Sequence, residues 1–186
     1  MHIQNFHLRR EDSAILVIDL QDKLLTAIHD EETIRRNTSV LLEAAKTYGL
    51  SAFYSEQYPK GLGATNALIL DQLQKLDAFG IEKTAYSALS PEMGDALKKS
   101  GRGQIVVAGA ETHVCVFQTV RALLQAGYSV YVPVDAVSSR TEQNRTIGLD
   151  LMEKMGAMLT STETVLFDLI GDAGDVHFKS LQALIK

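Results

Sequence analysis

The chain has 186 residues, of which 46% are hydrophobic and 22% charged, and it contains only 3 prolines. Its length suits one domain, since domains typically have about 100–200 residues, and its apolar content excludes a disordered or fibrous chain. The 18 Lys and Arg against 23 Asp and Glu give a net charge of −5, which argues against nucleic acid as the main partner because such proteins carry a basic surface. We therefore expect a single globular domain over residues 1–186.

The apolar runs are short, and the beginning of the chain is charged. Residues 105–110 form one of the longest apolar runs, far below the roughly 20 residues that a membrane-spanning helix needs. Residues 1–12 lack the apolar centre of a secretory signal. The single cysteine, Cys115, cannot form an internal disulfide, which fits a reducing compartment. We expect a cytoplasmic protein without a membrane span.

The first predicted elements form a strand, a helix and a second strand. Residues 14–18 are continuously apolar, as in a strand buried on both faces, and this strand ends at Asp19. Residues 33–48 have apolar side chains at helical spacing and stop at Gly49, a favourable end for a helix. Residues 51–54 then predict a second short strand. This order is typical of a parallel sheet with crossover helices.

The same alternation continues along the rest of the chain. Residues 57–66 form a loop because they contain Pro and Gly, and Ser90 followed by Pro91 predicts the start of a helix that ends near residue 101. The remaining predicted strands are residues 81–84, 104–108, 128–134 and 157–160, and the remaining predicted helices are residues 65–76, 114–125, 141–155, 162–170 and 176–185. Six strands with intervening helices predict a doubly wound α/β fold, a six-stranded parallel sheet with helices on both faces.

In such sheets ligands bind beyond the carboxyl ends of the strands, and three reactive side chains lie there. Asp19 closes the first strand, Lys83 ends the third, and Cys115 opens the helix after the fourth. Taken singly, each has a simpler explanation: a solvated strand-end carboxylate, a surface lysine and a buried cysteine. Together they predict a catalytic site. We expect the N-terminus of the helix to lower the pKa of the thiol and make it a nucleophile.

Other polar and aromatic residues are candidates for the substrate pocket. His113 is not expected to be the base for Cys115, because side chains two residues apart on a helix point to different faces. We expect the pocket to be lined by Gln21, Tyr54, Gln57, Tyr86 and His113. Near the end of the fifth strand, Asp135 and Arg140 are compatible with either a helix-capping loop or the rim of this pocket.

The sequence contains no pattern typical of a cofactor or metal site. Its Gly-x-Gly pairs at residues 61–63 and 101–103 lack the context of a dinucleotide site, and there is no phosphate-binding loop. The five histidines show no ligand spacing, and one cysteine cannot supply a thiolate cage. We expect neither a metal nor a cofactor.

Five segments together resemble the isochorismatase-like cysteine hydrolases, and within them the short isochorismatase-domain-containing branch. They occur in family order over nearly the whole chain, at residues 14–22, 56–63, 82–87, 107–119 and 135–140. The resemblance implies a six-stranded parallel sheet and a catalytic triad at Asp19, Lys83 and Cys115. It also implies a cis peptide bond between Ala110 and Glu111, which would aim the backbone amides of Glu111 and Cys115 into one oxyanion hole.

Departures from the family narrow the expected chemistry. The nicotinamidase branch holds a metal through an Asp and histidines after the second strand, whereas residues 55–59 contain no histidine, so nicotinamide is not expected as the substrate. True isochorismatases cleave a vinyl ether without a nucleophilic cysteine, and Cys115 therefore favours acyl chemistry. We expect hydrolysis of a small amide or related carbonyl compound through a Cys115 thioester. The alternatives are a non-catalytic binding or scaffold protein and a vinyl ether hydrolase. The resemblance also implies a homo-oligomer.

Overall fold

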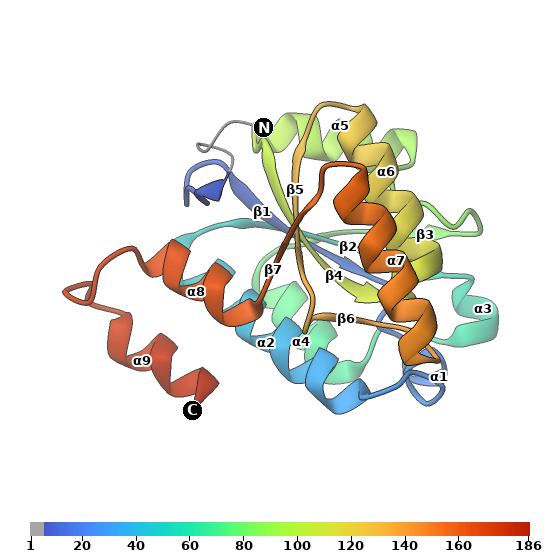
Figure 1. The fold of residues 1–186 in the computed structure, drawn as a ribbon, viewed down its shortest axis with the longest axis horizontal. Coiled ribbons are helices and arrows are strands. Elements are labelled where there is room, and N and C mark those ends of the chain that lie inside the picture. Colours follow the sequence, from blue (N-terminus) through green and yellow to red (C-terminus); the bar gives the residue numbers. More distant parts are fainter. Residues whose placement is uncertain (1–5) are drawn as a thin grey trace.

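The computed structural model describes residues 6–186, so residues 1–5 of the predicted domain lie outside the described part. Its centre is a parallel sheet in the order β3-β2-β1-β4-β5-β7, with the short strand β6 paired to β4 (Figure 1). The strands are β1 Ser13–Ile18, β2 Ser51–Gln57, β3 Phe79–Lys83, β4 Gln104–Ala110, β5 Ser129–Pro133, β6 Val137–Ser138 and β7 Met158–Thr160. The predicted doubly wound parallel sheet is confirmed, with seven strands instead of six because the two-residue β6 was not predicted.

Helices cover both faces of this sheet (Figure 1). One face packs against α2 Glu31–Tyr48, α4 Ala67–Lys75, α8 Thr162–Ile170 and α9 Phe178–Gln182. The other face packs against α5 Pro91–Ser100, α6 Phe117–Gln125 and α7 Glu142–Lys154. Short helical segments lie between these elements: α1 Asp22–Leu25, α3 Pro59–Leu62, the π-helix η2 Thr112–Val116 and the 3-10 helix η3 Ala183–Ile185. None of the helices among residues 6–186 is long and apolar enough to cross a membrane.

Strand β1 lies in the middle of the sheet and is buried along its whole length. Because side chains alternate between the faces of a strand, Ile15 and Val17 pack on the α2 side while Leu16 and Ile18 pack on the α6 side. Burial on both faces explains why this segment is continuously apolar. Strands β1 and β4 are parallel neighbours, and the order in which strands are added to the sheet reverses between them. The crevice at their carboxyl ends is where this type of fold binds ligands.

Several helix ends follow the predicted signals. Ser90 Oγ accepts a hydrogen bond from the backbone N–H of Met93, with Pro91 in the first helical turn. Gly49 ends α2 in the left-handed conformation, at φ 66°, that glycine adopts without a steric penalty.

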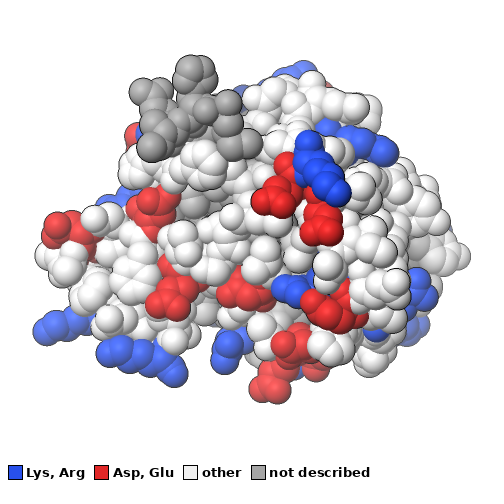
Figure 2. All heavy atoms as spheres, in the orientation of Figure 1, with Lys and Arg blue, Asp and Glu red and all other residues white. Residues whose placement is uncertain are grey.

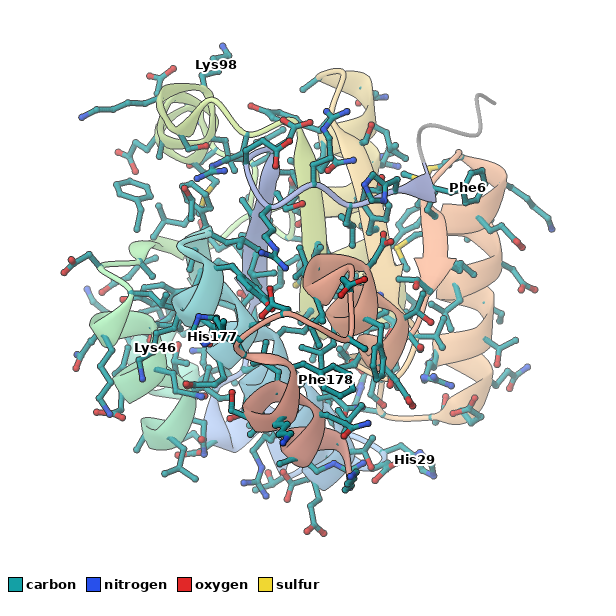
Figure 3. All side chains as sticks on the ribbon, turned by 90° about the vertical axis from the view of Figure 1, so that its left-hand side faces the viewer. Phe6, His29, Lys46, Lys98, His177 and Phe178 are labelled. Atoms are coloured by element: carbon teal, nitrogen blue, oxygen red, sulfur yellow. The ribbon has the colours of Figure 1, made fainter. Side chains whose placement is uncertain are left out.

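Aromatic packing joins the last two α-helices. Phe178 of α9, labelled in Figure 3, packs against Phe167 of α8 with ring centroids 6.3 Å apart. These contacts hold the C-terminal helix against the sheet-covering layer.

The largest local difference from the sequence prediction lies before α6. A single helix was predicted over residues 114–125, but the structure has a π-helical turn from Thr112 to Val116, and the α-helix begins at Phe117. The backbone N–H of Phe117 donates to the carbonyl of Thr112, five residues earlier. This pattern accommodates one extra residue in the turn, and such turns occur frequently at functional sites.

Candidate active site

The three predicted catalytic residues lie together at the carboxyl ends of neighbouring strands. Asp19 follows β1, Lys83 is the last residue of β3, and Cys115 lies in η2 immediately after β4. All three are buried, with exposed fractions of 0%, 7% and 6%. The Cys115 thiol and the Asp19 carboxylate each shift the pKa of the other, and the structure therefore gathers the predicted triad into one cluster.

Asp19 is held by contacts to two strands. Its Oδ2 lies 2.6 Å from Lys83 Nζ, and its Oδ1 accepts a hydrogen bond from Ser55 Oγ at 2.7 Å. Its backbone N–H donates to the carbonyl of Ser55, and its own backbone takes a left-handed conformation with φ 53°. Burial raises the pKa of this carboxyl group above its usual value, while the Lys83 charge and the hydrogen bonds from Lys83, Ser55 and Cys115 act in the opposite direction.

The Lys83 ammonium is surrounded by oxygen acceptors. Besides Asp19 Oδ2, Nζ contacts Gln57 Oε1 at 2.6 Å and the backbone carbonyls of Ala85 and Tyr86 at 3.3 and 3.1 Å. An ammonium has three N–H donors, so these four oxygen acceptors share them. This geometry fits a residue that orients Asp19 and offsets its charge.

The predicted effect of the helix terminus on Cys115 is wrong. Instead of being lowered, the pKa of the thiol is raised to about 12, chiefly by burial and also by the negative charge of Asp19, against which Lys83 acts. The thiol packs in the apolar cluster on the α6 face with Val116 and Leu149, and this environment disfavours a thiolate. The resting thiol is therefore protonated, and the carboxylate that interacts with it is Asp19.

Glu111 lies immediately before the π-helical turn that contains Cys115. The Ala110–Glu111 peptide bond is cis, as the resemblance implied. The Glu111 carbonyl accepts hydrogen bonds from the backbone N–H groups of Val114 and Val116. Its side chain accepts two more from Arg140, one from the backbone N–H and one from Nε, both at 3.0 Å. Arg140 therefore anchors this turn from the outside.

Two predicted pocket residues have structural roles away from an opening. Gln21 is fully buried, and its amide bonds the backbone N–H and carbonyl of Gln57 and the carbonyl of Gly63. The Tyr54 ring lies over Gly80, where an added Cβ would be 2.2 Å from Tyr54 Cζ, and packs with the α2-side core. Tyr54 therefore points away from the face to which Ser55 points, because successive strand residues alternate. Their contribution to a substrate pocket stays a prediction.

The other pocket candidates lie close to the triad. Gln57 Oε1 accepts a hydrogen bond from the Lys83 ammonium. The backbone carbonyl of Tyr86 also accepts from this ammonium, while Tyr86 as a whole is 55% exposed. His113 lies in η2 with Nδ1 3.0 Å from Ser139 Oγ. Of the two roles considered for Asp135, the contacts fit helix capping. Its Oδ1 accepts hydrogen bonds from the backbone N–H and the hydroxyl of Thr162 at the start of α8.

Ser55 is a site residue that sequence analysis missed. Its hydroxyl is 1% exposed and bonds Asp19. The signal was a serine within a short strand otherwise rich in apolar and aromatic residues, but its partner depends on the pairing of β1 with β2, which sets Ile18 opposite Ser55.

The described residues offer no metal site built from several side chains. Residues 6–186 contain no group of three or more His, Cys, Asp or Glu side chains arranged to hold a metal ion.

Comparisons with known proteins agree with this architecture. A model of the isochorismatase domain matches residues 13–164. Isochorismatase domain-containing protein 2 from Xenopus laevis is 37% identical over 179 residues, which cover 96% of this chain and 85% of the relative. The solved structure of the MAR1 ribonuclease from Caenorhabditis elegans is 36% identical with a TM-score of 0.91, covering 96% of this chain and 92% of that chain.

A more distant solved structure shares the fold alone. YcaC from Escherichia coli, described as an octameric hydrolase of unknown specificity, is 24% identical with a TM-score of 0.87, and the match covers 100% of this chain and 96% of that chain. The parallel sheet and its covering helices are therefore retained at low sequence identity.

Proposed function

The chain belongs to the isochorismatase domain family, and from this premise we propose that it is a cysteine hydrolase acting on a small amide or related carbonyl compound. The observation that carries the proposal is the buried cluster of Asp19, Lys83 and Cys115, in which Lys83 Nζ lies 2.6 Å from Asp19 Oδ2 and the Asp19 carboxylate interacts with the Cys115 thiol. A protonated thiol beside a carboxylate of raised pKa is a nucleophile paired with its general base.

The proposed reaction has two steps. Asp19 takes the thiol proton while Sγ attacks the carbonyl carbon, and the C–N bond then breaks as Asp19 passes that proton to the leaving amine. The product of this step is a thioester on Cys115. Asp19 next removes a proton from water, whose oxygen attacks the thioester carbon, and the acid leaves as the proton returns to the thiolate. Water is thus the only co-reactant consumed.

Two groups of this chain would stabilise the charges that develop. The backbone N–H groups of Glu111 and Cys115 are the proposed oxyanion donors, and one such donor contributes about 2.7–4 kcal/mol in comparable sites. Lys83 stabilises the ionised form of Asp19, since its ammonium lies 2.6 Å from Asp19 Oδ2. A raised carboxyl pKa also brings the base closer to neutral pH, where proton transfer in both directions is most effective.

The alternatives are a vinyl ether hydrolase, a non-catalytic binding protein and a nuclease. The C. elegans neighbour is described as a ribonuclease, so RNA belongs in the test. Against RNA stand the net charge of −5 and the intermixing of acidic and basic side chains on the face drawn in Figure 2, since RNA binding needs a concentrated basic surface.

The deciding experiment is a substrate panel of small amides, esters, a vinyl ether and single-stranded RNA, tested with the parent protein and with Cys115→Ala and Asp19→Asn. We expect amine release from one or more amides by the parent and none above background by either variant. Hydrolysis of the vinyl ether by Cys115→Ala at the parent rate supports the isochorismatase-type reaction instead. RNA cleavage that survives Cys115→Ala supports a different site, and an inert parent supports the binding protein.

We also propose that the protein forms a homo-oligomer. Ile147 and Leu151 lie one turn apart on α7 and are 46% and 43% exposed, an arrangement that favours contact with another apolar surface. The same helix packs against η2 through Gly148, so such an interface would lie near the site. Light scattering on the parent and on Ile147→Asp tests this, and a monomeric parent contradicts it.

A further inference from the structure

The first turn of α6 contains a buried hydroxyl group that touches both halves of the site. Thr119 is completely buried. Its Oγ1 donates to the carbonyl of Cys115 at 2.7 Å and accepts a hydrogen bond from the backbone N–H of Ala88 at 2.8 Å. Thr119 thereby connects the turn of the nucleophile to the loop that follows β3.

Only one of these two hydrogen bonds follows from helix geometry. A threonine in a helix commonly bonds the carbonyl four residues earlier, which accounts for the bond to Cys115. The bond from Ala88 joins residues that are 31 positions apart. Since Ala88 is itself fully buried, its N–H would have no water to replace the hydroxyl, and a buried donor without an acceptor is costly.

The loop fixed in this way also surrounds Lys83. Residues 84–90 include Ala85 and Tyr86, whose carbonyls accept from the Lys83 ammonium. The loop ends at Ser90, which caps α5. Any movement of Ala88 relative to α6 would therefore displace acceptors of Lys83 and, through Lys83, the carboxylate of Asp19.

We propose that Thr119 is a positioning residue for the hydrolytic reaction, whose hydroxyl sets the distance between the Lys83 loop and the Cys115 turn. This inference rests on the proposed function, because it assumes that Asp19 and Lys83 act on the Cys115 thiol. It assigns no direct contact with substrate to Thr119.

The test compares Thr119→Val, which keeps the shape and removes the hydroxyl, with Thr119→Ser, which keeps the hydroxyl. Cys115 is the only cysteine of the chain, so the rate of alkylation by iodoacetamide at neutral pH reports on this thiol alone. We expect alkylation to be about tenfold slower in Thr119→Val and within about twofold of the parent in Thr119→Ser, the scale expected when a buried donor loses its acceptor. On a substrate found in the panel, kcat should fall similarly while KM changes little.

Amide hydrogen exchange at Ala88 provides the second readout, and we expect it to be faster in Thr119→Val only. An unchanged or faster alkylation in that variant, with faster exchange at Ala88, shows a merely structural hydroxyl and overturns the proposal. A Ser variant as slow as the Val variant also overturns it. If Thr119→Val does not fold, Thr119→Ala takes its place with the same expectations. Because alkylation needs no turnover, these results are separate from hydrolysis by Cys115→Ala, which alone overturns the proposed function.

Discussion

Ser55 Oγ lies 2.7 Å from Asp19 Oδ1, on the side of the carboxylate opposite Lys83. Together the two donors occupy both carboxylate oxygens, and the Asp19 side chain is completely buried. This arrangement fixes the plane of the carboxylate and stabilises its ionised form against the effect of burial. The reactivity of the base therefore depends on β2 as well as on β3.

Replacing Ser55 with Ala removes one of these donors. We expect the pKa of Asp19 to rise further, because the hydrogen bond from Ser55 favours the ionised form. A protonated carboxyl cannot accept the thiol proton, so activity should be lost on acidification at a higher pH than in the parent. The unfolding free energy at neutral pH should fall by about 1–3 kcal/mol, as for other buried groups left without a partner.

The measurement is the pH dependence of kcat/KM for an amide substrate, with chemical denaturation for stability. Ser13→Ala is the matched control, because Ser13 is also fully buried and its hydroxyl bonds Gln104 at the opposite end of β1. The control should change stability without moving the pH profile. An acid limb that stays in place in Ser55→Ala would show that Ser55 does not tune the base.

A second prediction concerns the close packing of α7 on the nucleophile turn. A Cβ added at Gly148 would lie 2.9 Å from the carbonyl carbon and oxygen of Thr112 and from the backbone nitrogen of His113. These are backbone atoms of η2, so the turn must shift to admit even a methyl group. We expect Gly148→Ala to lose activity at least tenfold and to cost about 1–3 kcal/mol of stability, as overpacking usually does.

Gly94 supplies the control for this substitution. It is also a helical glycine, in α5, but its added Cβ would meet only Leu89 Cδ1, at 4.0 Å. Gly94→Ala should leave activity unchanged and raise stability by up to about 1 kcal/mol, since alanine is the better helix former. If the two variants behave alike, the close approach of α7 does not position the turn.

The sequence predicted the three residues of the proposed triad because the signals for them are local. A buried strand followed by Asp19, and a helix start near Cys115, are visible as apolar runs with polar ends, and the parallel fold then brings strand ends together. The face on which Tyr54 lies could not be obtained in this way, because alternation gives two faces without saying which one holds the site. The pKa of Cys115 was predicted in the wrong direction because burial by distant residues outweighs the local effect of the helix terminus.

The contacts that orient the triad were also beyond the sequence. Ser55 meets Asp19 through the register of β1 on β2, and Thr119 meets Ala88 across 31 residues. Both depend on long-range packing. The π-helical turn depends on the same packing, since α7 approaches it at Gly148. Residue type and spacing predicted which residues form the candidate site, and tertiary contacts determine how their side chains are oriented.

The third prediction concerns the ion pair between the Arg140 side chain and Glu111, because substitution of Arg140 removes the bond from Nε and leaves the bond from its backbone N–H in place. The Arg140 side chain is 60% exposed while that of Glu111 is 11% exposed, so the pair contributes little to global stability but ties the turn to the segment after β6. We expect Arg140→Ala to lower kcat by roughly tenfold, with a change in stability below about 1 kcal/mol. Steady-state kinetics and thermal unfolding measure the two effects.

Arg35→Ala is the control, because it removes another partly exposed ion pair, the one with Glu31. It should change neither kcat nor stability. A parental kcat in Arg140→Ala would exclude a role in holding the turn.

The raised pKa of Cys115 also predicts how stability depends on pH. The thiol pKa is about 12 in the folded protein against an ordinary value of 9.0, so the folded state keeps a proton that the unfolded chain releases in this window. Linkage then requires that the contribution of the protonated thiol to stability is fully present below pH 9.0 and is lost as pH rises toward about 12.

Cys115→Ser removes this titration while keeping a small polar side chain. The unfolding free energy of the parent should therefore fall more steeply than that of Cys115→Ser over this range, as measured by urea denaturation at a series of pH values. Other alkaline groups are common to both proteins and cancel in the difference. If the two curves stay parallel, burial does not raise the pKa of the Cys115 thiol.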